Sequence, residues 1–223
     1  MSDPEGRRGF VGLAGGEVTA LDLTTGAVIW GRTGLGQPLA ANLSRLVTLH
    51  HSGGELALRL TDALTGQDIA RISGLDLPNW AQEVIGEPNA ICFHAKNEGT
   101  SIRVSWSLRR PYRGGAPPGP AIAGALPAAH LSGSILLDPA NGDVLERGQG
   151  TAPVEQLRSV VSTDPSVLAQ EQIGDRVYRL KVAPVAPGGA EMAVEASSAA
   201  NGNVEWITPV GTVPDIGPTP LRP

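Results

Sequence analysis

The sequence predicts an all-β protein, folded as one domain of repeated antiparallel sheets, and three observations support this prediction. The 223 residues are enough for one sizeable hydrophobic core. The 29 glycines and 19 prolines are spread between short apolar runs, a pattern typical of many short strands joined by turns. An eleven-residue motif occurs four times along the chain, so the sheets are expected to repeat one unit.

The motif is complete once, in residues 20–30, where it has the form A-x-D-x-x-T-G-x-x-x-W. Partial copies follow in residues 60–70, 136–146 and 196–206. The aspartate can accept hydrogen bonds from the turn amides, glycine supplies the positive φ of a tight hairpin, and the final tryptophan can pack between neighbouring sheets. The motif therefore predicts a strand, a turn and a second strand. Its repeated positions are Ala20, Asp22, Gly26 and Trp30, then Asp62 and Gly66, then Asp138 and Gly142, and finally Gly202 and Trp206.

This motif resembles the tryptophan-docking repeat of the pyrroloquinoline-quinone-type (PQQ-like) β-propellers, a superfamily that includes quinoprotein alcohol dehydrogenases and the outer-membrane β-barrel assembly lipoprotein. The resemblance implies a β-propeller with four four-stranded blades per chain. Residues 212–221 are expected to supply the inner strand that the first blade lacks. The four blades either close into a ring or form half of an eight-bladed ring completed in a homodimer. The implied blades of the single domain, 1–223, are residues 9–36, 37–78, 79–150 and 151–211.

The clearest insertion covers residues 107–130 and is rich in proline and glycine, so regular structure is not expected there. It carries three arginines and a tyrosine, which make it a candidate partner-binding loop; the alternative is a solvated hairpin. A second insertion, residues 183–190, is expected in the corresponding place of the last blade. Both are expected between third and fourth strands, on the same side of adjacent blades. The candidate binding residues are Arg109, Arg110, Tyr112 and Arg113.

The types of residue present argue against catalysis and against a cofactor. The resemblance implies, for the dehydrogenases, adjacent cysteines and a metal site of Glu, Asn and Asp, but this chain has the single cysteine Cys92. Cys92 is expected to be a small buried apolar residue. His94 and His130 are the polar groups to test if a pocket exists, whereas the repeated aspartates are expected to be structural. The sequence therefore predicts a noncatalytic chain with no cofactor and no bound metal.

Charge and hydropathy restrict the partners and the compartment. The formal net charge is −5 and the basic residues are scattered, so a nucleic-acid partner is not expected. No apolar stretch approaches the roughly 20 residues that span a bilayer, and the first residues lack the apolar core of a signal peptide. The chain is expected to be cytoplasmic, or extracytoplasmic if a signal has been removed. Arginine outnumbers lysine by 15 to 2, which suggests a GC-rich bacterial genome.

These observations favour a noncatalytic binding or scaffold module for a protein or peptide partner, as the resemblance to the assembly lipoprotein implies. Fold alone does not fix function, so two alternatives stay open. One is a small-molecule-binding protein or an enzyme with a pocket at the propeller axis or at the dimer seam. The other is an extracytoplasmic sensor domain of a larger receptor.

Overall fold

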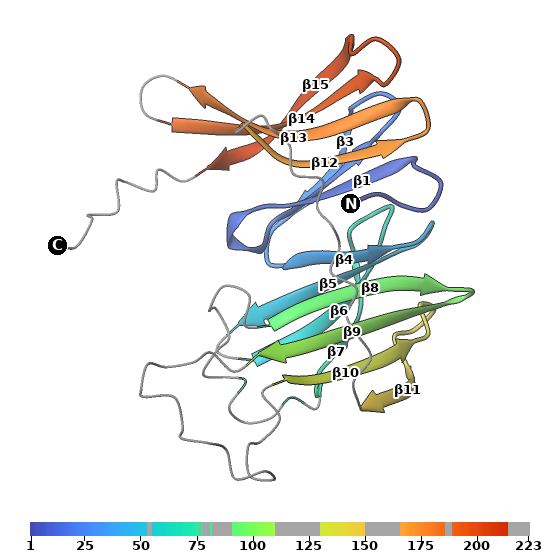
Figure 1. Ribbon diagram of the computed structural model, residues 1–223. Helices are drawn as coiled ribbons and strands as arrows, with labels where there is room; N and C mark the ends of the chain where they lie inside the picture. The colour runs from blue at the N-terminus through green and yellow to red at the C-terminus, as the bar shows by residue number, and fades with distance from the viewer. Residues whose placement is uncertain are drawn as a thin grey trace, which may run out of the picture.

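The protein is built from antiparallel β-sheets (Figure 1). The computed structural model describes residues 1–52, 55–75, 77, 81, 91–109, 130–149, 166–185 and 189–213. Within these ranges there are four sheets, each a meander of strands consecutive in sequence; three have four strands and the first has three. The predicted all-β class and the four repeated sheets are therefore confirmed.

We number the sheets I to IV in chain order. Sheet I contains β1 (Arg8–Gly12), β2 (Val18–Asp22) and β3 (Val28–Arg32), with a short 3₁₀ turn, Ala14–Gly16, between β1 and β2. Sheet II contains β4 (Gln37–Ala41), β5 (Arg45–Ser52), β6 (Glu55–Asp62) and β7 (Asp68–Ile72). Sheet III contains β8 (Ile91–Glu98), β9 (Ser101–Arg109), β10 (His130–Leu137) and β11 (Val144–Gln149). Sheet IV contains β12 (Val167–Ile173), β13 (Arg176–Val185), β14 (Gly189–Ser198) and β15 (Val204–Val213).

Burial alternates along the strands, as a period of two requires. In β9, Ile102, Val104 and Trp106 are buried against sheet II, while Arg103 and Ser105 between them lie on the opposite face. This alternation sets the pairing register, because a slip of one residue would move every apolar side chain of the strand to the wrong face.

The sheets stack face to face in the order IV, I, II, III, so that the last sheet of the chain packs on the first (Figure 1). Apolar clusters fill each of these three contacts. The clusters include Phe10 with Leu46 between sheets I and II, Leu58 with Val104 between II and III, and Leu21 with Val194 between I and IV. Among the described sheets, I and II are thus covered on both faces, whereas III and IV are each covered on one.

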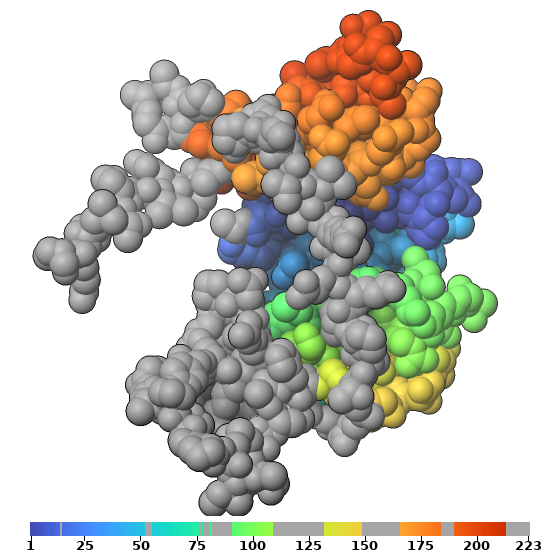
Figure 2. Space-filling view, viewed as in Figure 1, coloured from blue at the N-terminus to red at the C-terminus, as the bar shows by residue number. Residues whose placement is uncertain are grey.

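Among the described residues the four sheets do not close into a ring. Sheets III and IV lie at opposite ends of the stack (Figure 2), and no apolar cluster of the described residues joins them. The arrangement is propeller-like, with sheets packed as successive blades are, but it is an open array. The described residues therefore show four sheets but not the closed four-bladed ring that was expected. They also give no support to a dimeric ring.

The inner edge of sheet I is paired at one end by the first residues of the chain. Ser2 forms an antiparallel bridge with Gly9, and the Phe10 N–H donates to the Met1 carbonyl at 2.8 Å. The segment expected on this edge was 212–221; its first two residues belong to β15 of sheet IV, and the remainder lies outside the described residues. That expectation therefore stays a prediction.

Both insertions fall in the hairpin between the second and third strands of their sheets. Arg109 at the end of β9 is opposite His130 at the start of β10, and Val185 is opposite Gly189 in the hairpin of β13 and β14. Counted over the described strands, the insertions thus lie one hairpin earlier than the expected third and fourth strands. The expectation of adjacent blades is also wrong, because sheets III and IV occupy the two ends of the array.

Candidate functional site

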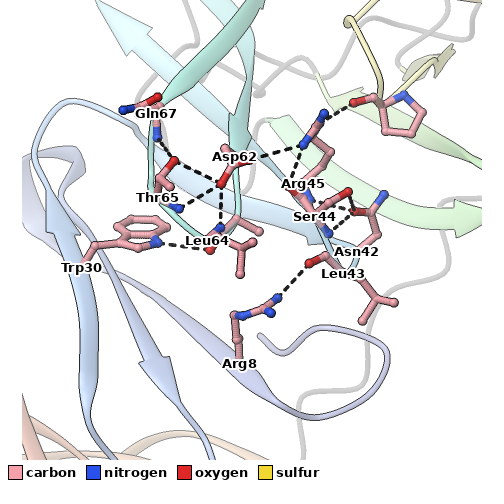
Figure 3. A network of polar contacts seen from close by, with 12 residues as sticks. Arg8, Trp30, Asn42, Leu43, Ser44, Arg45, Asp62, Leu64, Thr65 and Gln67 are labelled. Carbon is pink, nitrogen blue, oxygen red and sulfur yellow. Dashed lines mark hydrogen bonds and ion pairs between the residues drawn. The ribbon is translucent and has the colours of Figure 1, made fainter.

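Each sheet turns between its last two strands in the same way, and a side chain at the first turn position stabilises the turn. The Asp22 carboxylate accepts the backbone N–H groups of Thr25 and Thr24 at 2.9 and 2.8 Å, and these bonds lower the pKa of Asp22 below its usual 3.8. Asp62 accepts the same pair of bonds in sheet II (Figure 3). In sheet IV the position is Ser198, whose hydroxyl accepts an N–H at the longer distance of 3.3 Å.

The glycine of this turn is the point at which the neighbouring sheet makes contact. Gly66 has a φ of 70° and lies beneath the indole of Trp30; a Cβ at Gly66 would be 3.0 Å from that ring. Gly26 is covered in the same way by Trp206, with 2.6 Å from the Cβ position to the ring. Glycine is therefore favoured here twice, by the backbone angle and by the close approach of the ring. In the third contact, Ala70 replaces tryptophan over Gly142.

In each of the three sheet contacts, a side chain of one sheet donates a hydrogen bond to the turn of the next. The acceptor is always the carbonyl of the residue that follows the aspartate. The donors and acceptors are Trp30 Nε1 to Ala63 at 3.1 Å (Figure 3), the Tyr178 hydroxyl to Leu23 at 3.1 Å, and Arg45 Nε to Pro139 at 2.7 Å. In each pair the donor comes from the sheet packed on the turn. In the contact of sheets IV and I the Leu23 carbonyl binds Tyr178, and the buried Trp206 Nε1 has no hydrogen-bond partner among the described residues.

The turn of sheet IV has the same backbone construction. Gly202 has a φ of 73°, and its N–H donates to the Ser198 carbonyl at 2.9 Å, as the Gly26 N–H donates to the Asp22 carbonyl at 2.8 Å. Unlike its counterparts Gly26, Gly66 and Gly142, which are buried, Gly202 is exposed, and so are all residues of 199–203. No described atom lies within 4 Å of its Cβ position. Within the described chain, this is the turn that no sheet covers.

The face of sheet IV turned away from sheet I carries paired charges. Arg179 and Lys181 contact Glu195 at 3.3 and 2.7 Å, and Arg179 also donates to the Ser197 hydroxyl at 2.7 Å. Directly opposite Glu195 on β15 lies Ile207, whose residue exposure is 59%. This face therefore combines charge with an exposed apolar side chain, and its composition differs from the apolar faces inside the stack.

The face of sheet III turned away from sheet II is also polar. Arg103 contacts Glu98 at 2.8 Å and Glu146 at 3.3 Å, and Lys96 contacts Glu98 at 2.9 Å. Glu146 occupies the motif position at which sheets I and IV have tryptophan. A charged residue held in an ion pair does not provide the apolar cover that Trp30 gives to the next sheet, and no sheet of the described residues packs on this face.

Cys92 and His94 lie on this same polar face, in the edge strand β8. Cys92 is exposed, so the expectation of a buried thiol is wrong; the physical reason is that no sheet of the described residues covers this face. Cross-strand pairing places Cys92 opposite Ser107 and His94 opposite Ser105. No group of three or more His, Cys, Asp or Glu side chains in the described ranges could hold a metal ion.

The candidate residues of the long insertion are only partly covered by the structure. Arg109 and His130 face each other as a backbone pair at the base of the hairpin, whereas Arg110, Tyr112 and Arg113 lie outside the described residues. His94 lies opposite Ser105, which in turn pairs with Ser134, so His94 and His130 are in different rows of the sheet. The two histidines proposed for one pocket are therefore not neighbours across the strands.

Two hollows are found at other places in the described structure. A pocket of about 140 Å³ at the seam of sheets I and IV has an apolar lining, with Gln170, Glu171 and Arg179 also on its wall. A wider, glycine-lined hollow of about 630 Å³ lies beside His50 and His51. Burial and the nearby Arg59 lower the pKa of His50. In the described part of the chain no helix is long and apolar enough to cross a membrane.

No protein-family model matches this chain, and no curated protein matches it in sequence. Among solved structures, acylaminoacyl peptidase of Pyrococcus horikoshii is 9% identical, with a TM-score of 0.35, covering 85% of this chain and 27% of that one. Quinohemoprotein alcohol dehydrogenase of Comamonas testosteroni is 13% identical, with a TM-score of 0.37, covering 91% of this chain and 34% of that one. BamB of Moraxella catarrhalis is 10% identical, with a TM-score of 0.30, covering 95% of this chain and 62% of that one. The chain thus spans less than two thirds of each of them.

The propeller-like architecture accordingly rests on the strand pairing and the sheet packing of the chain itself. The turn of sheet IV and the polar end faces were not singled out by sequence reasoning. The sequence did carry one signal for the polar face of sheet III, the glutamate Glu146 at a position where two other copies of the motif have tryptophan.

Proposed function

We propose that this chain is a noncatalytic scaffold that binds a protein partner through the open end of its sheet array. The observation that supports this proposal is the exposed turn of sheet IV, 199–203, which has the construction of three turns that other sheets cover. Beside it lies a sheet face with Ile207 59% exposed and Val204 51% exposed next to the Arg179 ion pair. Arginine together with exposed apolar side chains is a composition typical of protein interfaces.

The insertion between β9 and β10 is a second surface of the same proposal. Arg109, Arg110, Tyr112 and Arg113 combine cationic and aromatic side chains, and these residue types are enriched among the side chains that dominate binding energy. The base of the insertion belongs to sheet III and the exposed turn to sheet IV, and these two sheets lie at opposite ends of the described array.

Site-specific photocrosslinking in the source cells tests the proposal. A benzophenone amino acid is placed at Ile207 on sheet IV or at Tyr112 in the insertion, with Leu64, an exposed turn residue of sheet II, as the matched control. We expect a discrete protein adduct from Ile207 or Tyr112 and none from Leu64, followed by saturable binding of the purified adduct protein. No adduct at either test position, or equal adducts at all three, would overturn the proposal.

A small-molecule site is the second candidate function, and the seam pocket of sheets I and IV favours it. Phe10, Leu21 and Val194 give this pocket an apolar lining, and Ser2 and Glu171, which are hydrogen-bonded to each other at 2.8 Å, also lie on its wall. Few polar groups in an apolar hollow is the usual arrangement of ligand pockets, although about 140 Å³ admits only a small molecule. Saturable heat from a small ligand, lost in Val194→Trp, would favour this function over the scaffold.

The eight-bladed homodimer requires the outer face of sheet III in one copy to pack on the outer face of sheet IV in the other. Both faces carry ion pairs, around Arg103 in one and Glu195 in the other. Packing them together would remove these charges from water without the apolar clusters that join the other sheets. We therefore propose an array that ends in polar faces, in the way that capping repeats end a solenoid.

A further inference from the structure

We propose that the turn of sheet IV, residues 199–203, is a docking site for a tryptophan presented on a β-strand of a partner protein. This inference rests on the proposed scaffold function and names the chemistry that the partner offers. Two turns of the same construction in this molecule already hold an indole, at Gly66 and at Gly26. The shape of the turn is thus one that this protein uses twice to receive a tryptophan.

The backbone of the open turn has the same hydrogen bonds as the two turns that hold an indole. The Ala199 N–H donates to the Asp175 carbonyl at 2.7 Å, as the Ala63 N–H donates to the Ser44 carbonyl at 2.9 Å. Across the base of the turn, the Ser198 N–H donates to the Asn203 carbonyl at 2.9 Å, as the Asp62 N–H donates to the Gln67 carbonyl at 2.8 Å. The receptor is therefore formed before any partner arrives, which lowers the entropic cost of binding.

The hydrogen-bond acceptor for an indole is also in place. The Ala199 carbonyl is the counterpart of the Ala63 carbonyl, which accepts the Trp30 N–H, and of the Leu23 carbonyl, which accepts the Tyr178 hydroxyl. Ala199 is exposed, whereas Ala63 and Leu23 are buried. A tryptophan over Gly202 would find both the space above the glycine and an acceptor for its N–H.

The occupant is a strand of a different protein, because a second copy offers no tryptophan at the matching position. The equivalent strand of sheet III carries Glu146, which is bound to Arg103. The described ion pairs of sheet IV hold three cations, Arg176, Arg179 and Lys181, against two carboxylates, Glu195 and Glu205. A partner strand with an acidic residue near its tryptophan would complement this charge.

An NMR titration of the ¹⁵N-labelled full chain tests the proposal with a defined probe. The probe is the synthetic hairpin of residues 18–32, which contains β2, its turn and β3 with the tryptophan that docks on Gly66. The matched probe is the same peptide with Trp30→Ala. We expect saturable shifts of the amides of 199–203 with the first peptide, and binding weaker by about tenfold or more with the second.

Gly202→Asn and Gly99→Asn provide the protein-side comparison. Asparagine tolerates the left-handed backbone of both turns, and neither glycine has a described atom within 4 Å of its Cβ position. A side chain at Gly202 fills the place of the indole, so Gly202→Asn should abolish the shifts while Gly99→Asn preserves them. The peptide comparison needs no protein variant, so it remains decisive if Gly202→Asn fails to fold.

The outcomes separate this inference from the function on which it rests. Shifts that are equal for both peptides, or that occur away from 199–203, overturn the docking site. If at the same time Ile207 or Tyr112 still gives a discrete protein adduct, the scaffold function stands and only the tryptophan site is lost. Absence of adducts with intact tryptophan-dependent shifts would overturn the function in cells while leaving the turn a receptor for indole.

Discussion

Trp30 and Trp206 cover equivalent glycines but differ in one hydrogen bond. The Trp30 N–H donates to the Ala63 carbonyl at 3.1 Å, whereas the Trp206 N–H is buried with no partner among the described residues. A buried donor without an acceptor loses its hydrogen bond to water and gains nothing in return. Burying the indole of Trp206 therefore carries the free-energy cost of an unpaired donor, which burying the indole of Trp30 does not.

This difference predicts losses of stability of different size when each tryptophan is replaced by phenylalanine. Trp30→Phe removes a formed hydrogen bond and should lower the free energy of unfolding by about 1 kcal/mol beyond the loss of ring area. Trp206→Phe removes an unpaired donor, so only the smaller ring area counts against it. Urea unfolding followed by circular dichroism measures both; an equal or larger loss in Trp206→Phe would contradict the assignment.

The carboxylate of Asp22 links turn stability to pH. Its bonds from the N–H groups of Thr25 and Thr24 lower its pKa in the folded chain below the 3.8 expected when unfolded. A lowered folded pKa gives a stabilisation that is complete above about pH 4 and is lost as the pH falls through the folded value. Asp22→Asn should therefore flatten the decline in urea midpoint between about pH 4 and pH 2. Parallel declines in the two proteins would rule out this contribution.

At the scale of elements, the turn of sheet IV is the weakest copy of the repeated hairpin. Asp62 accepts two backbone N–H groups at 2.9 Å, but the Ser198 hydroxyl accepts one at 3.3 Å. A carboxylate accepts stronger hydrogen bonds than a hydroxyl.

Ser198→Asp should consequently strengthen this hairpin. We expect a gain of about 1 kcal/mol in the free energy of unfolding at neutral pH, from one additional and one stronger hydrogen bond. Ser198→Ala serves as the control, since it removes the existing bond and should destabilise the chain. An aspartate variant no more stable than the natural serine would show that the turn is already fully stabilised by its backbone.

The last hairpin of each sheet was predictable from the sequence because its signal is local. A Gly at a fixed spacing, an Asp in three of the four copies and alternating apolar residues indicate a strand, a turn and a strand. The polar end faces were not predictable in this way. Lys96 and Arg103 lie on one face with Glu146 only once strand register is known, and register depends on pairing between distant segments.

The exposed site was also beyond local reasoning. Gly202 looks like Gly26 and Gly66 in the sequence, and only the stacking order IV, I, II, III reveals that nothing described covers it. The exposure of Cys92 has the same origin. A thiol in an apolar run is buried only where another sheet packs on its face, and no described sheet packs on the face that carries Cys92.

At the scale of the whole molecule, two charged end faces predict a monomer. A ring of eight sheets would double the 23.0 kDa mass of the chain. Light scattering across a dilution series should give the single-chain mass at every concentration. A concentration-independent doubled mass would contradict this expectation and restore the dimeric ring; Arg103→Leu with Glu146→Leu, which makes the end of sheet III apolar, should by contrast promote association.

The packing of the last sheet on the first also governs how the chain can fold as it is synthesised. Leu21 and Leu23 of sheet I are buried by residues of sheet IV, from which they are separated by most of the chain. Sheets I, II and III can assemble in order as they leave the ribosome, but one apolar side of sheet I must wait for residues 166–213. Until those residues arrive, the growing chain exposes this apolar side, so the burial of Leu21 and Leu23 depends on contact between segments far apart in the sequence.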